Sequence, residues 1–460
     1  MSFSLELTPA QHDLVARVHQ FAEEEIRPVA ERYDREEEFP WPVLERAAEE
    51  GLYNALFYRD LITDPTGLSL PLLMEEMFWG CAGIGLSIVM PALALSAIAQ
   101  AASPDQLVKW APKCFGDPGD LKLAALCISE PQGGSDVANL RTTARKDGDE
   151  WVIDGHKIWI GNGGIANVHV VNATVDPELG HRGQALFIVP GDTPGLRLVR
   201  KLEKLGCRAS HTAELKFENC RIPAENLLGG GEKLDKRLDD ARAAQSQTGE
   251  GDKGSATLGA FEQTRPMVAA QALGIARAAF EFACEYAGGR EAFGQPIIEN
   301  QGIAFPLADI AAEIDAARLL TWRAAWMGAQ GVPFHLGEGS MSKLKASEVA
   351  VRATEQAVQT MGGWGYIKDF PVEKWYRNAK LYTIFEGTSE IQRLVIGRTL
   401  GESAAEGPLH ARVPRDRAGL SRALGRGSPT RTKAGVALMR GVEKAPDRLL
   451  RLPGKIIAPS

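Results

Sequence analysis

Hydrophobic positions recur with the spacing of helices over the first part of the chain. One such run follows Thr8, with apolar side chains at Leu14, Val15, Val18, Phe21 and Ala22. Thr8 and Gln11 fit a capping box, in which each side chain bonds the backbone N–H of the other residue. Pro28 and Pro40 then divide the pattern into shorter helices. The pattern predicts an N-terminal helical domain over residues 1–117.

The pattern changes after Asp117-Pro118-Gly119 to short apolar runs separated by turn residues. Such runs are typical of strands, so residues 118–228 are predicted to form a β domain. Within it, residues 151–160 (WVIDGHKIWI) contain Asp154-Gly155, a dipeptide that supplies the positive φ angles of a two-residue turn. This segment is predicted to be a hairpin.

Residues 229–257 are polar and glycine-rich, which predicts a surface insertion with a helix over about 232–244. Helical periodicity then returns in three long stretches, residues 261–287, 303–327 and 340–361. Each is apolar around much of its circumference, as in the helices of a bundle. The order α, β, α differs from a βαβ alternation or a Rossmann pattern. We therefore expect an α+β multi-domain protein, with a C-terminal helical domain over 258–403 and a tail over 404–460.

The stretch Met77–Pro104 has no charged residue and is long enough to cross a bilayer. Gly80, Gly83 and Pro91 interrupt it, however, and no positive charges flank it. A buried pair of helices is therefore the preferred interpretation, with a membrane span as the alternative.

Composition adds an asymmetry of charge to this picture. The 460 residues exceed what one hydrophobic core holds, and their net charge is −7. Residues 408–460 nevertheless hold twelve Lys or Arg and three Asp or Glu. We expect this basic tail to be solvated and partly disordered. Contact with a membrane surface or a partner protein is the alternative, and nucleic acid is less favoured.

The six cysteines show neither a CxxC motif nor metal-ligand spacing, and no metal cluster stands out among the eight histidines. Buried thiols in a reducing compartment are therefore expected, and no metal site. The N-terminus lacks a basic segment followed by an apolar one, so no secretory signal is expected. These features predict a cytoplasmic protein.

Four segments carry side chains suited to chemistry, and each also has a structural explanation. Residues 129–136 (SEPQGGSD) follow an apolar strand, where a glycine-rich loop exposes backbone N–H groups to a ligand or forms an ordinary turn. Residues 157–164 (KIWIGNGG) place a tryptophan before glycines, where it stacks on a flat cofactor or simply packs. Residues 362–366 (GGWGY) follow a predicted helix, and a helix C-cap is the alternative to a binding loop.

The fourth segment, residues 384–392 (IFEGTSEIQ), places Glu386 at a break between two predicted helices. Ser389 and Gln392 fit a capping box for the second helix. Apolar neighbours should desolvate Glu386, which raises the pKa of a carboxyl and makes it a better base near neutral pH. A solvated glutamate at a helix end is the alternative.

Taken together and in this order, the four segments resemble the acyl-CoA dehydrogenase family over about residues 5–403. The resemblance implies an N-terminal α-helical domain, a middle β-barrel-like domain and a C-terminal four-helix bundle. It also implies FAD as cofactor and a homotetramer or homodimer. The matching motifs are EGTSEIQR at 386–393, EP and GSD at 130–136, TRP at 264–266, REAFG at 290–294, Gln301, and Q-x-x-GG at 359–363.

For the reaction, the resemblance implies α,β-dehydrogenation of an acyl-CoA thioester to the trans-2-enoyl-CoA. Glu386 would remove the α-proton while the β-hydrogen passes as hydride to flavin N5. Hydrogen bonds to the thioester carbonyl would stabilise the developing oxyanion. Electrons would then pass to an electron-transfer flavoprotein. An acyl-CoA oxidase or flavin monooxygenase of the same fold is one alternative, and a non-catalytic protein that binds membranes or nucleic acid through its basic tail is another.

The resemblance also implies which residues form the sites. Substrate contacts would come from Ser135, Glu262, Arg265 and Gly387. The FAD of the same subunit would be contacted by Leu126, Ile128, Ser129, Ser135, Trp159, Gly161, Thr388 and Glu390. The FAD of a neighbouring subunit would be reached by Arg290, Phe293, Gln301, Gln359, Gly362 and Gly363.

The sequence departs from the family at several of these positions. Gly161 stands where many members have a Thr or Ser that bonds flavin N5, so the flavin potential is expected to differ. The loop reads EPQGGSD instead of EPGAGSD, and Glu390 replaces a frequent Gln. Thr264 lies where some branches place an alternative catalytic Glu, but we expect the base at Glu386.

One segment of the sequence bears on the length of the acyl chain. Residues 83–89 (GIGLSIV) match the helix that forms the floor of the acyl pocket in the family. Gly85 and Val89 are small or apolar there, which predicts a deep pocket for medium or long straight chains.

Overall fold

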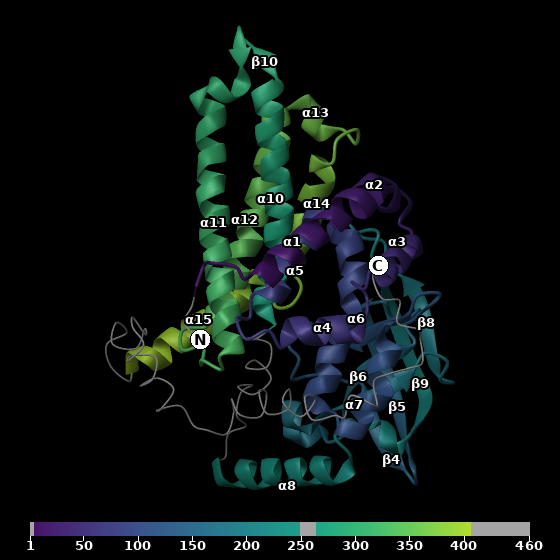
Figure 1. Ribbon diagram of the computed structural model, residues 1–460. Coiled ribbons are helices and arrows are strands. Elements are labelled where there is room, and N and C mark those ends of the chain that lie inside the picture. Colours follow the sequence, from purple (N-terminus) through teal and green to yellow (C-terminus); the bar gives the residue numbers. More distant parts are fainter. Residues whose placement is uncertain (1–3, 249–263, 406–460) are drawn as a thin grey trace.

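The computed structural model describes residues 4–248 and 264–405, in which a curled sheet follows one set of helices and precedes another (Figure 1). Helices account for most of the chain before residue 115, strands for most of residues 116–223, and helices again from residue 265. The expected fold class is confirmed: an N-terminal helical domain, a middle β domain and a C-terminal helical domain. Glu262 and the basic tail from residue 406 lie outside the described residues.

The N-terminal helices begin where the sequence places capping residues and prolines. At the start of α1 the Thr8 N donates to Gln11 Oε1 at 2.9 Å and the Gln11 N donates to Thr8 Oγ1 at 3.3 Å, so the expected capping box is confirmed. Prolines occupy the first turns of α1, α3 and α7, where a helix N–H has no partner to lose. Pro28 does not end a helix, because α2 continues directly from α1 through a π-helical turn, Ala22–Ile26. The helices are α1 (Pro9–Phe21), α2 (Arg27–Glu36), α3 (Trp41–Glu49), α4 (Ala55–Ile62), α5 (Ser69–Gly80), α6 (Ala82–Ala101) and α7 (Pro104–Trp110).

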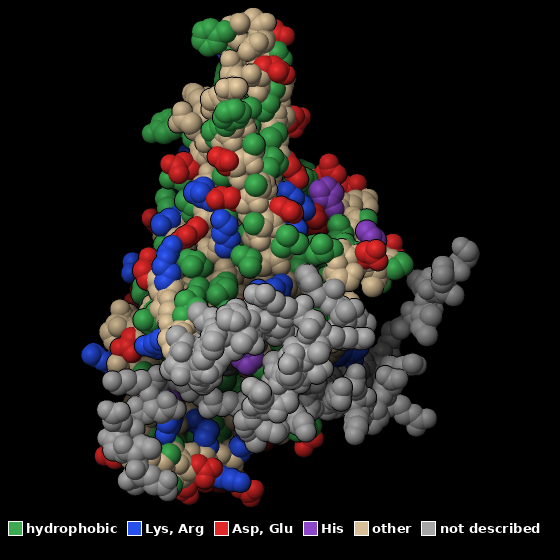
Figure 2. All heavy atoms as spheres, turned by 90° about the vertical axis from the view of Figure 1, so that its left-hand side faces the viewer, with side chains coloured by type: hydrophobic (Ala, Val, Ile, Leu, Met, Phe, Trp, Pro, Cys, Tyr) green, Lys and Arg blue, Asp and Glu red, His purple; other side chains and the backbone are tan. Residues whose placement is uncertain are grey.

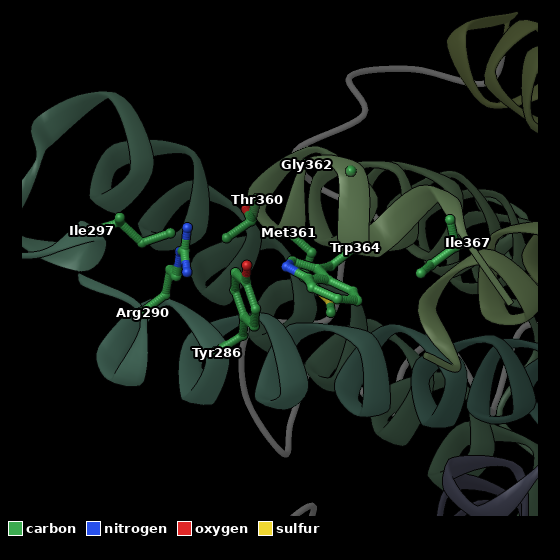
Figure 3. Close-up of a pocket in the computed structure, with 9 residues that line it drawn as sticks. Tyr286, Arg290, Ile297, Thr360, Met361, Gly362, Trp364 and Ile367 are labelled. Atoms are coloured by element: carbon green, nitrogen blue, oxygen red, sulfur yellow. The ribbon is translucent and has the colours of Figure 1, made fainter. Parts of the chain in front are cut away.

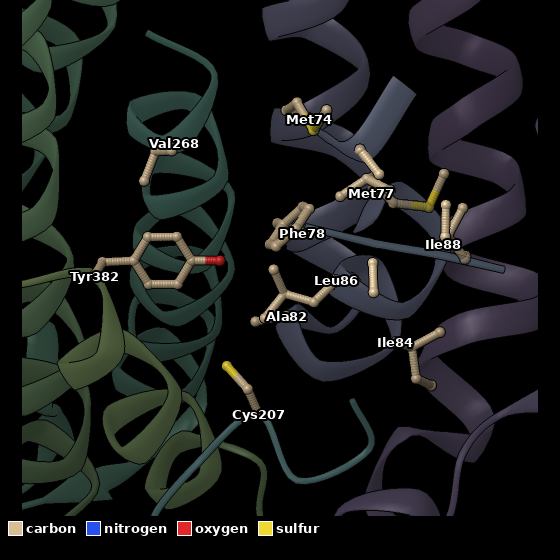
Figure 4. Close-up of a cluster of buried hydrophobic side chains, with 14 of the residues drawn as sticks. Met74, Met77, Phe78, Ala82, Ile84, Leu86, Ile88, Cys207, Val268 and Tyr382 are labelled. Atoms are coloured by element: carbon tan, nitrogen blue, oxygen red, sulfur yellow. The ribbon is translucent and has the colours of Figure 1, made fainter. Parts of the chain in front are cut away.

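The uncharged stretch forms the end of α5 and the whole of α6. By length and composition, α6 and α10 (Arg265–Gly289) could each cross a membrane, but 67% of the apolar window of each is buried inside the protein. Met77, Phe78 and Leu86 pack into the same hydrophobic core as Tyr382 from a C-terminal helix (Figure 4). This packing agrees with a buried helix pair and disfavours a membrane span.

The main sheet has seven strands, in the order β3-β6-β4-β5-β9-β8 with β7 paired to β6. β3 runs parallel to β6, whereas β5 is antiparallel to both β4 and β9. A separate small hairpin, β1 (Gly116–Asp117) with β2 (Asp120–Leu121), precedes it. The strands are β3 (Ala124–Cys127), β4 (Thr143–Asp147), β5 (Glu150–Gly161), β6 (Val168–Thr174), β7 (Gln184–Pro190), β8 (Leu196–Lys201) and β9 (Thr212–Pro223).

The hairpin expected at Asp154-Gly155 is wrong. Strand β5 runs unbroken through both residues, and its register against β9 shifts there, as at a β-bulge. A Cβ at Gly155 would lie 2.3 Å from Thr142 Oγ1, so glycine is needed for close packing and not for a turn. The turn lies between β4 and β5 instead, where Gly148 has a φ of 62°.

The C-terminal domain is built on three long helices. The hairpin β10 (Glu291–Ala292) with β11 (Gln295–Pro296) joins the first two at one end of the bundle (Figure 1). The insertion contains a helix, α8 (Gly231–Thr248), as expected, and its apolar residues Leu234, Leu238 and Ala241 are buried. The other helices are α10, α11 (Gln301–Ala329), α12 (Glu338–Met361), α13 (Gly363–Tyr366), α14 (Val372–Tyr382) and α15 (Ser389–Ala405).

Helix α10 connects the two helical domains, because it packs against α5 as well as α11 and α12. Its buried face consists largely of alanine. A Cβ at Gly274 would lie 2.3 Å from the Glu75 carbonyl oxygen and 2.8 Å from the Trp79 backbone nitrogen. Only glycine permits the two backbones to approach this closely.

Buried charges bridge the same joint. Glu75 accepts a hydrogen bond from Arg318 Nη2 at 2.7 Å, and Glu76 accepts one from Arg277 Nη1 at 2.6 Å. His19 Nδ1 lies 2.8 Å from the second oxygen of Glu76. Burial raises the pKa of Glu76, but the bonds and charges of Arg277 and His19 outweigh it, so the pKa lies below its ordinary value. The network ties α1, α5, α10 and α11 together.

We expect Glu76→Gln to lower the free energy of unfolding by about 3 kcal/mol, because it leaves Arg277 without one of its charged partners in a buried network. Urea unfolding followed by circular dichroism measures the change. Glu49→Gln, which alters an exposed pair with Arg46, is the matched control and should change the free energy of unfolding far less, because water screens exposed pairs. Equal effects of the two substitutions would contradict a stabilising role for the network.

Candidate active site

Glu386 lies in the turn between α14 and α15, at the break that the sequence predicts. Its φ is 53° and that of Gly387 is 87°, so two successive residues adopt the left-handed region. For a glutamate this conformation costs about 1–2 kcal/mol, and surrounding contacts must maintain it. Backbone strain of this kind is concentrated at functional sites.

The capping box expected from Ser389 and Gln392 is wrong. Helix α15 begins at Ser389, so its N-cap is Thr388, whose Oγ1 accepts a hydrogen bond at 3.2 Å from the backbone N–H three residues later. Gln392 points back toward the turn, and its Nε2 donates to the Gly387 carbonyl at 2.8 Å and to the preceding carbonyl at 3.3 Å. The glutamine therefore holds the turn that carries Glu386.

Two buried cations face Glu386: Arg265, the first residue of α10, and Lys343 in α12. Arg265 Nη1 donates to Ser340 Oγ at 2.6 Å, and Lys343 Nζ donates to the Gly387 carbonyl at 2.7 Å. Burial raises the pKa of the Glu386 carboxyl, and the charges of Lys343 and Arg265 oppose this shift without cancelling it. The arrangement leaves a desolvated carboxyl near cations, as a proton acceptor requires.

Neither Lys343 nor Ser340 is among the residues predicted from sequence, although a signal for Lys343 exists. Lys343 lies on the same helix face as Ala346 and Ala350, three and seven residues later, and all three are buried. Lysine is almost never fully buried unless it is paired, so a lysine on an apolar stripe marks a special position.

The glycine-rich loop after β3 is held by a buried ion pair. Lys157 Nζ lies 2.8 Å from Glu130 Oε1, and both side chains are almost fully buried. Glu130 also accepts hydrogen bonds from the backbone N–H groups of Arg141 and Thr142, at 2.7 and 2.9 Å. Burial raises the pKa of Glu130, but these contacts lower it to about 2. The pair fixes the strand end at which the predicted residues Leu126, Ile128 and Ser129 lie.

Trp159 lies at a bulge of β5 with a φ of 61° and is 55% exposed. Its ring lies 3.7 Å from where a Cβ of Gly134 would be, so it stands over the glycine-rich loop that carries the exposed Ser135. This exposure argues against simple core packing. At the end of β5, a Cβ on Gly161 would lie 2.9 Å from the Met90 Sδ of α6. Met90 thus occupies the space that a side chain at 161 would need.

The remaining predicted residues lie at the other end of the long helices. Arg290 and Gly362 line a pocket of about 560 Å³ together with Tyr286 and Trp364 (Figure 3). The predicted C-cap is present as well, since the Gly362 N donates to the carbonyls of Val358 and Gln359. The pocket is lined by Tyr286, Arg290, Ile297, Thr360, Met361, Gly362, Gly363, Trp364 and Ile367.

The structure therefore places the predicted residues in three groups. Glu386, Gly387, Thr388, Glu390 and Arg265 surround the turn between α14 and α15, and Leu126, Ile128, Ser129, Ser135, Trp159 and Gly161 lie at the strand ends. Arg290, Phe293, Gln301, Gln359, Gly362 and Gly363 form the distant third group. Because α10 has 25 residues, at about 1.5 Å each its ends are about 37 Å apart, so one ligand cannot span the first and third groups.

Comparison with known proteins adds three family profiles that together cover most of the chain. Residues 8–117 match "Acyl-CoA dehydrogenase, N-terminal domain", residues 125–220 match the middle domain, and residues 252–401 match the C-terminal domain.

Individual proteins are similar over most of their length. The mitochondrial short-chain specific acyl-CoA dehydrogenase of Rattus norvegicus is 40% identical over 400 residues, which is 85% of this chain and 90% of the relative. The structure of butyryl-CoA dehydrogenase from Megasphaera elsdenii superposes with a TM-score of 0.74 at 32% identity, over 86% of this chain and 99% of the other. A chain from the work on the electron transferring flavoprotein of Acidaminococcus fermentans gives the same values.

The Glu130–Lys157 pair allows a test of the site that does not depend on what binds there. Lys157→Met should leave Glu130 buried without its cation, so the amides of residues 129–142 should exchange with deuterium at least about ten times faster. Hydrogen-exchange mass spectrometry measures this change. Lys146→Met, on the exposed side of β4, should leave those amides unaffected, and unchanged exchange in Lys157→Met would show that the pair does not hold the loop.

Proposed function

The chain belongs to the acyl-CoA dehydrogenase family, whose members are FAD-dependent flavoproteins, and from that membership we propose that Glu386 is its catalytic base. The activity is dehydrogenation of an acyl-CoA, an oxidoreductase reaction of fatty-acid β-oxidation. In the proposed mechanism Glu386 removes the α-proton, and the product is the trans-2-enoyl-CoA.

The observation that carries this proposal is the environment of Glu386. The α-proton of a thioester is weakly acidic, so its removal needs a positioned base and a donor for the charge that develops on the carbonyl oxygen. Burial raises the pKa of Glu386 toward neutrality while Lys343 and Arg265 favour its ionised form. No described residue accepts a hydrogen bond from the Glu386 backbone N–H, which leaves this group available to the thioester oxygen.

The strand ends offer a site that suits a flat cofactor. The exposed Trp159 ring provides a stacking surface, and Gly134 beneath it leaves the adjoining backbone without a side chain. Bound FAD supplies the acceptor for the hydride that leaves the β-carbon. Leu126, Ile128, Ser129, Ser135, Trp159, Gly161, Thr388 and Glu390 are proposed to hold it, and Ser135, Arg265 and Gly387 to contact the substrate. Glu262, outside the described residues, is proposed for the substrate as well.

We propose that the third group of residues contacts the FAD of a second subunit. The 25-residue length of α10 rules out one FAD that touches both groups within a single chain. Phe293 is fully exposed and Phe305 is 59% exposed, and hydrophobic side chains are visible along the outer face of the long helices (Figure 2). Exposed apolar surface of this kind indicates a protein interface. We therefore favour a homotetramer or homodimer in which Arg290, Phe293, Gln301, Gln359, Gly362 and Gly363 contact the neighbouring FAD.

An electron-transfer flavoprotein is the proposed electron acceptor, and the cytoplasm the proposed location. The acceptor is supported by the similarity to the chain studied with the electron transferring flavoprotein of Acidaminococcus fermentans. The location is supported by the six cysteines, which are all free thiols, five of them buried. A role of the basic tail at a membrane surface stays a prediction, since that tail lies outside the described residues.

A short acyl chain is favoured over the medium or long chains that Gly85 and Val89 suggest. A Cβ at Gly85 would lie 3.1 Å from the Phe78 ring, so the small residue makes room for an aromatic side chain instead of a substrate. Phe78 also contacts Tyr382 edge to face, and Tyr382 contacts Phe385 next to the base. The rat relative is named short-chain specific.

Glu386→Gln should keep the yellow colour of bound FAD but lose its bleaching by butyryl-CoA. The rate of flavin reduction should fall by about 10²–10⁴-fold, because the amide cannot accept the proton. Anaerobic stopped-flow absorbance measures the reduction. Glu355→Gln, on the exposed side of α12, should behave as the unchanged protein. Near-normal reduction in Glu386→Gln would assign the base to another residue.

Turnover should be highest with butyryl-CoA and fall for octanoyl-CoA and palmitoyl-CoA. Phe78→Leu shortens the aromatic side chain proposed to limit the length of the acyl chain. It should therefore raise kcat/KM for octanoyl-CoA relative to butyryl-CoA by about tenfold. Phe57→Leu, a change to an aromatic residue that packs on Tyr58, should leave the ratio unchanged. Preferred turnover of palmitoyl-CoA by the unchanged protein would contradict the short-chain proposal and support a deep acyl pocket.

A further inference from the structure

Lys343 is a charged side chain for which the family reaction assigns no role. Its side chain is fully buried in α12, and its ammonium donates a 2.7 Å hydrogen bond to the Gly387 carbonyl. Burying an ammonium group is costly unless its surroundings compensate for the lost water. A lysine at this position therefore needs an explanation other than packing.

The carbonyl that Lys343 holds belongs to the most strained part of the turn. Glu386 and Gly387 both have positive φ, and the Gly387 carbonyl accepts from Lys343 in α12 and from Gln392 in α15. Two donors from different helices thus fix the residue that follows the base. Loss of either donor would allow the turn to relax toward an ordinary conformation.

Charge provides a second link between Lys343 and Glu386. The groups that face Lys343 are Glu386 and Glu390, which stabilise its positive charge, and Arg265 from α10, which opposes it. Burial is the largest influence and lowers the pKa of Lys343 to about 8. The groups that face Glu386 are Lys343 and Arg265, and the charge of each lowers its pKa against the effect of burial. The charge of each group therefore favours the ionised form of the other.

We propose that Lys343 is a positioning residue for the base: it clamps the Gly387 carbonyl and supplies a positive charge that keeps the Glu386 carboxylate ionised. This inference rests on the proposed role of Glu386. The clamp places the carboxylate, and the charge sets the pH above which it accepts a proton. Lys343 touches neither substrate nor cofactor in this role.

Three substitutions separate the clamp from the charge. Lys343→Met removes both, Lys343→Gln keeps a donor without the charge, and Lys343→Arg keeps both. Lys345→Met, two residues along α12, is the matched control, because Lys345 is partly exposed and pairs with Glu313 at 3.3 Å. The Gln and Arg substitutions keep the proposal testable should Lys343→Met fail to fold.

The ionisation of Glu386 can be measured without substrate turnover. The infrared band of its protonated carboxyl is identified in the holoenzyme by its absence from Glu386→Gln and is then followed with pH. Removal of the lysine charge raises the pKa of the carboxyl, so the titration midpoint should move upward by about one to three pH units in Lys343→Met and Lys343→Gln. It should stay in place in Lys343→Arg and Lys345→Met.

The clamp is read from exchange of the α-hydrogens of butyryl-CoA with D2O, measured anaerobically by mass spectrometry at a pH above every midpoint. Lys343→Met should exchange at least about tenfold more slowly than Lys343→Gln, because only the glutamine retains a donor to Gly387. An unchanged midpoint in both neutral variants would overturn the charge role, and equal exchange in all variants would overturn the clamp. Exchange that persists in Glu386→Gln would instead overturn the proposed base, and the infrared titration would still report on Lys343.

Discussion

The close crossing of α5 and α10 is the constraint on which the rest of the molecule depends. Gly274 allows the two backbones to touch, and the carboxylates of Glu75 and Glu76 bond to arginines of α10 and α11 across the same joint. Because α6 follows α5 directly and packs against β3, this joint also sets the position of the sheet. Arg265, at the start of α10, is placed by the same helix. The strand ends and the turn with Glu386 are therefore held in one frame.

Two buried lysines each lie near a glutamate in this frame, but the two glutamates differ in their contacts and in their pKa. Lys157 and Glu130 form a closed ion pair at 2.8 Å, and Glu130 keeps a low pKa. Lys343 instead bonds a carbonyl next to Glu386 and acts on that carboxyl through charge, so the pKa of Glu386 stays raised. A paired carboxylate makes a poor base and a good structural support, whereas an unpaired one can accept a proton. The same two residue types thus support a loop in one place and, in the proposed mechanism, a catalytic base in the other.

Much of this arrangement could be predicted from sequence where the signal is local. The capping box of Thr8 and Gln11, the uncharged helix pair and the break at Glu386 each depend on neighbouring residues, and each is present in the structure. Asp154-Gly155 misled the prediction because a bulge and a turn use the same residue types, and only the packing against Thr142 distinguishes them.

The contacts that complete the site lie beyond the reach of local patterns. Lys343 and Gly387 are 44 residues apart in the chain. Glu130 and Lys157 are separated by 27 residues, and nothing in either segment alone indicates that they form an ion pair. Such contacts depend on how distant elements pack, which is where prediction from a single sequence ends.

Met90 packs against Gly161, the glycine that stands where many family members have Thr or Ser. Its thioether fills the space in front of Gly161, so a larger residue at the end of β5 would have to displace it. Methionine is flexible enough to move, but the movement would change the surface of α6. Strand and helix therefore cannot vary independently here: a side chain larger than glycine at position 161 requires a compensating change at Met90 of α6.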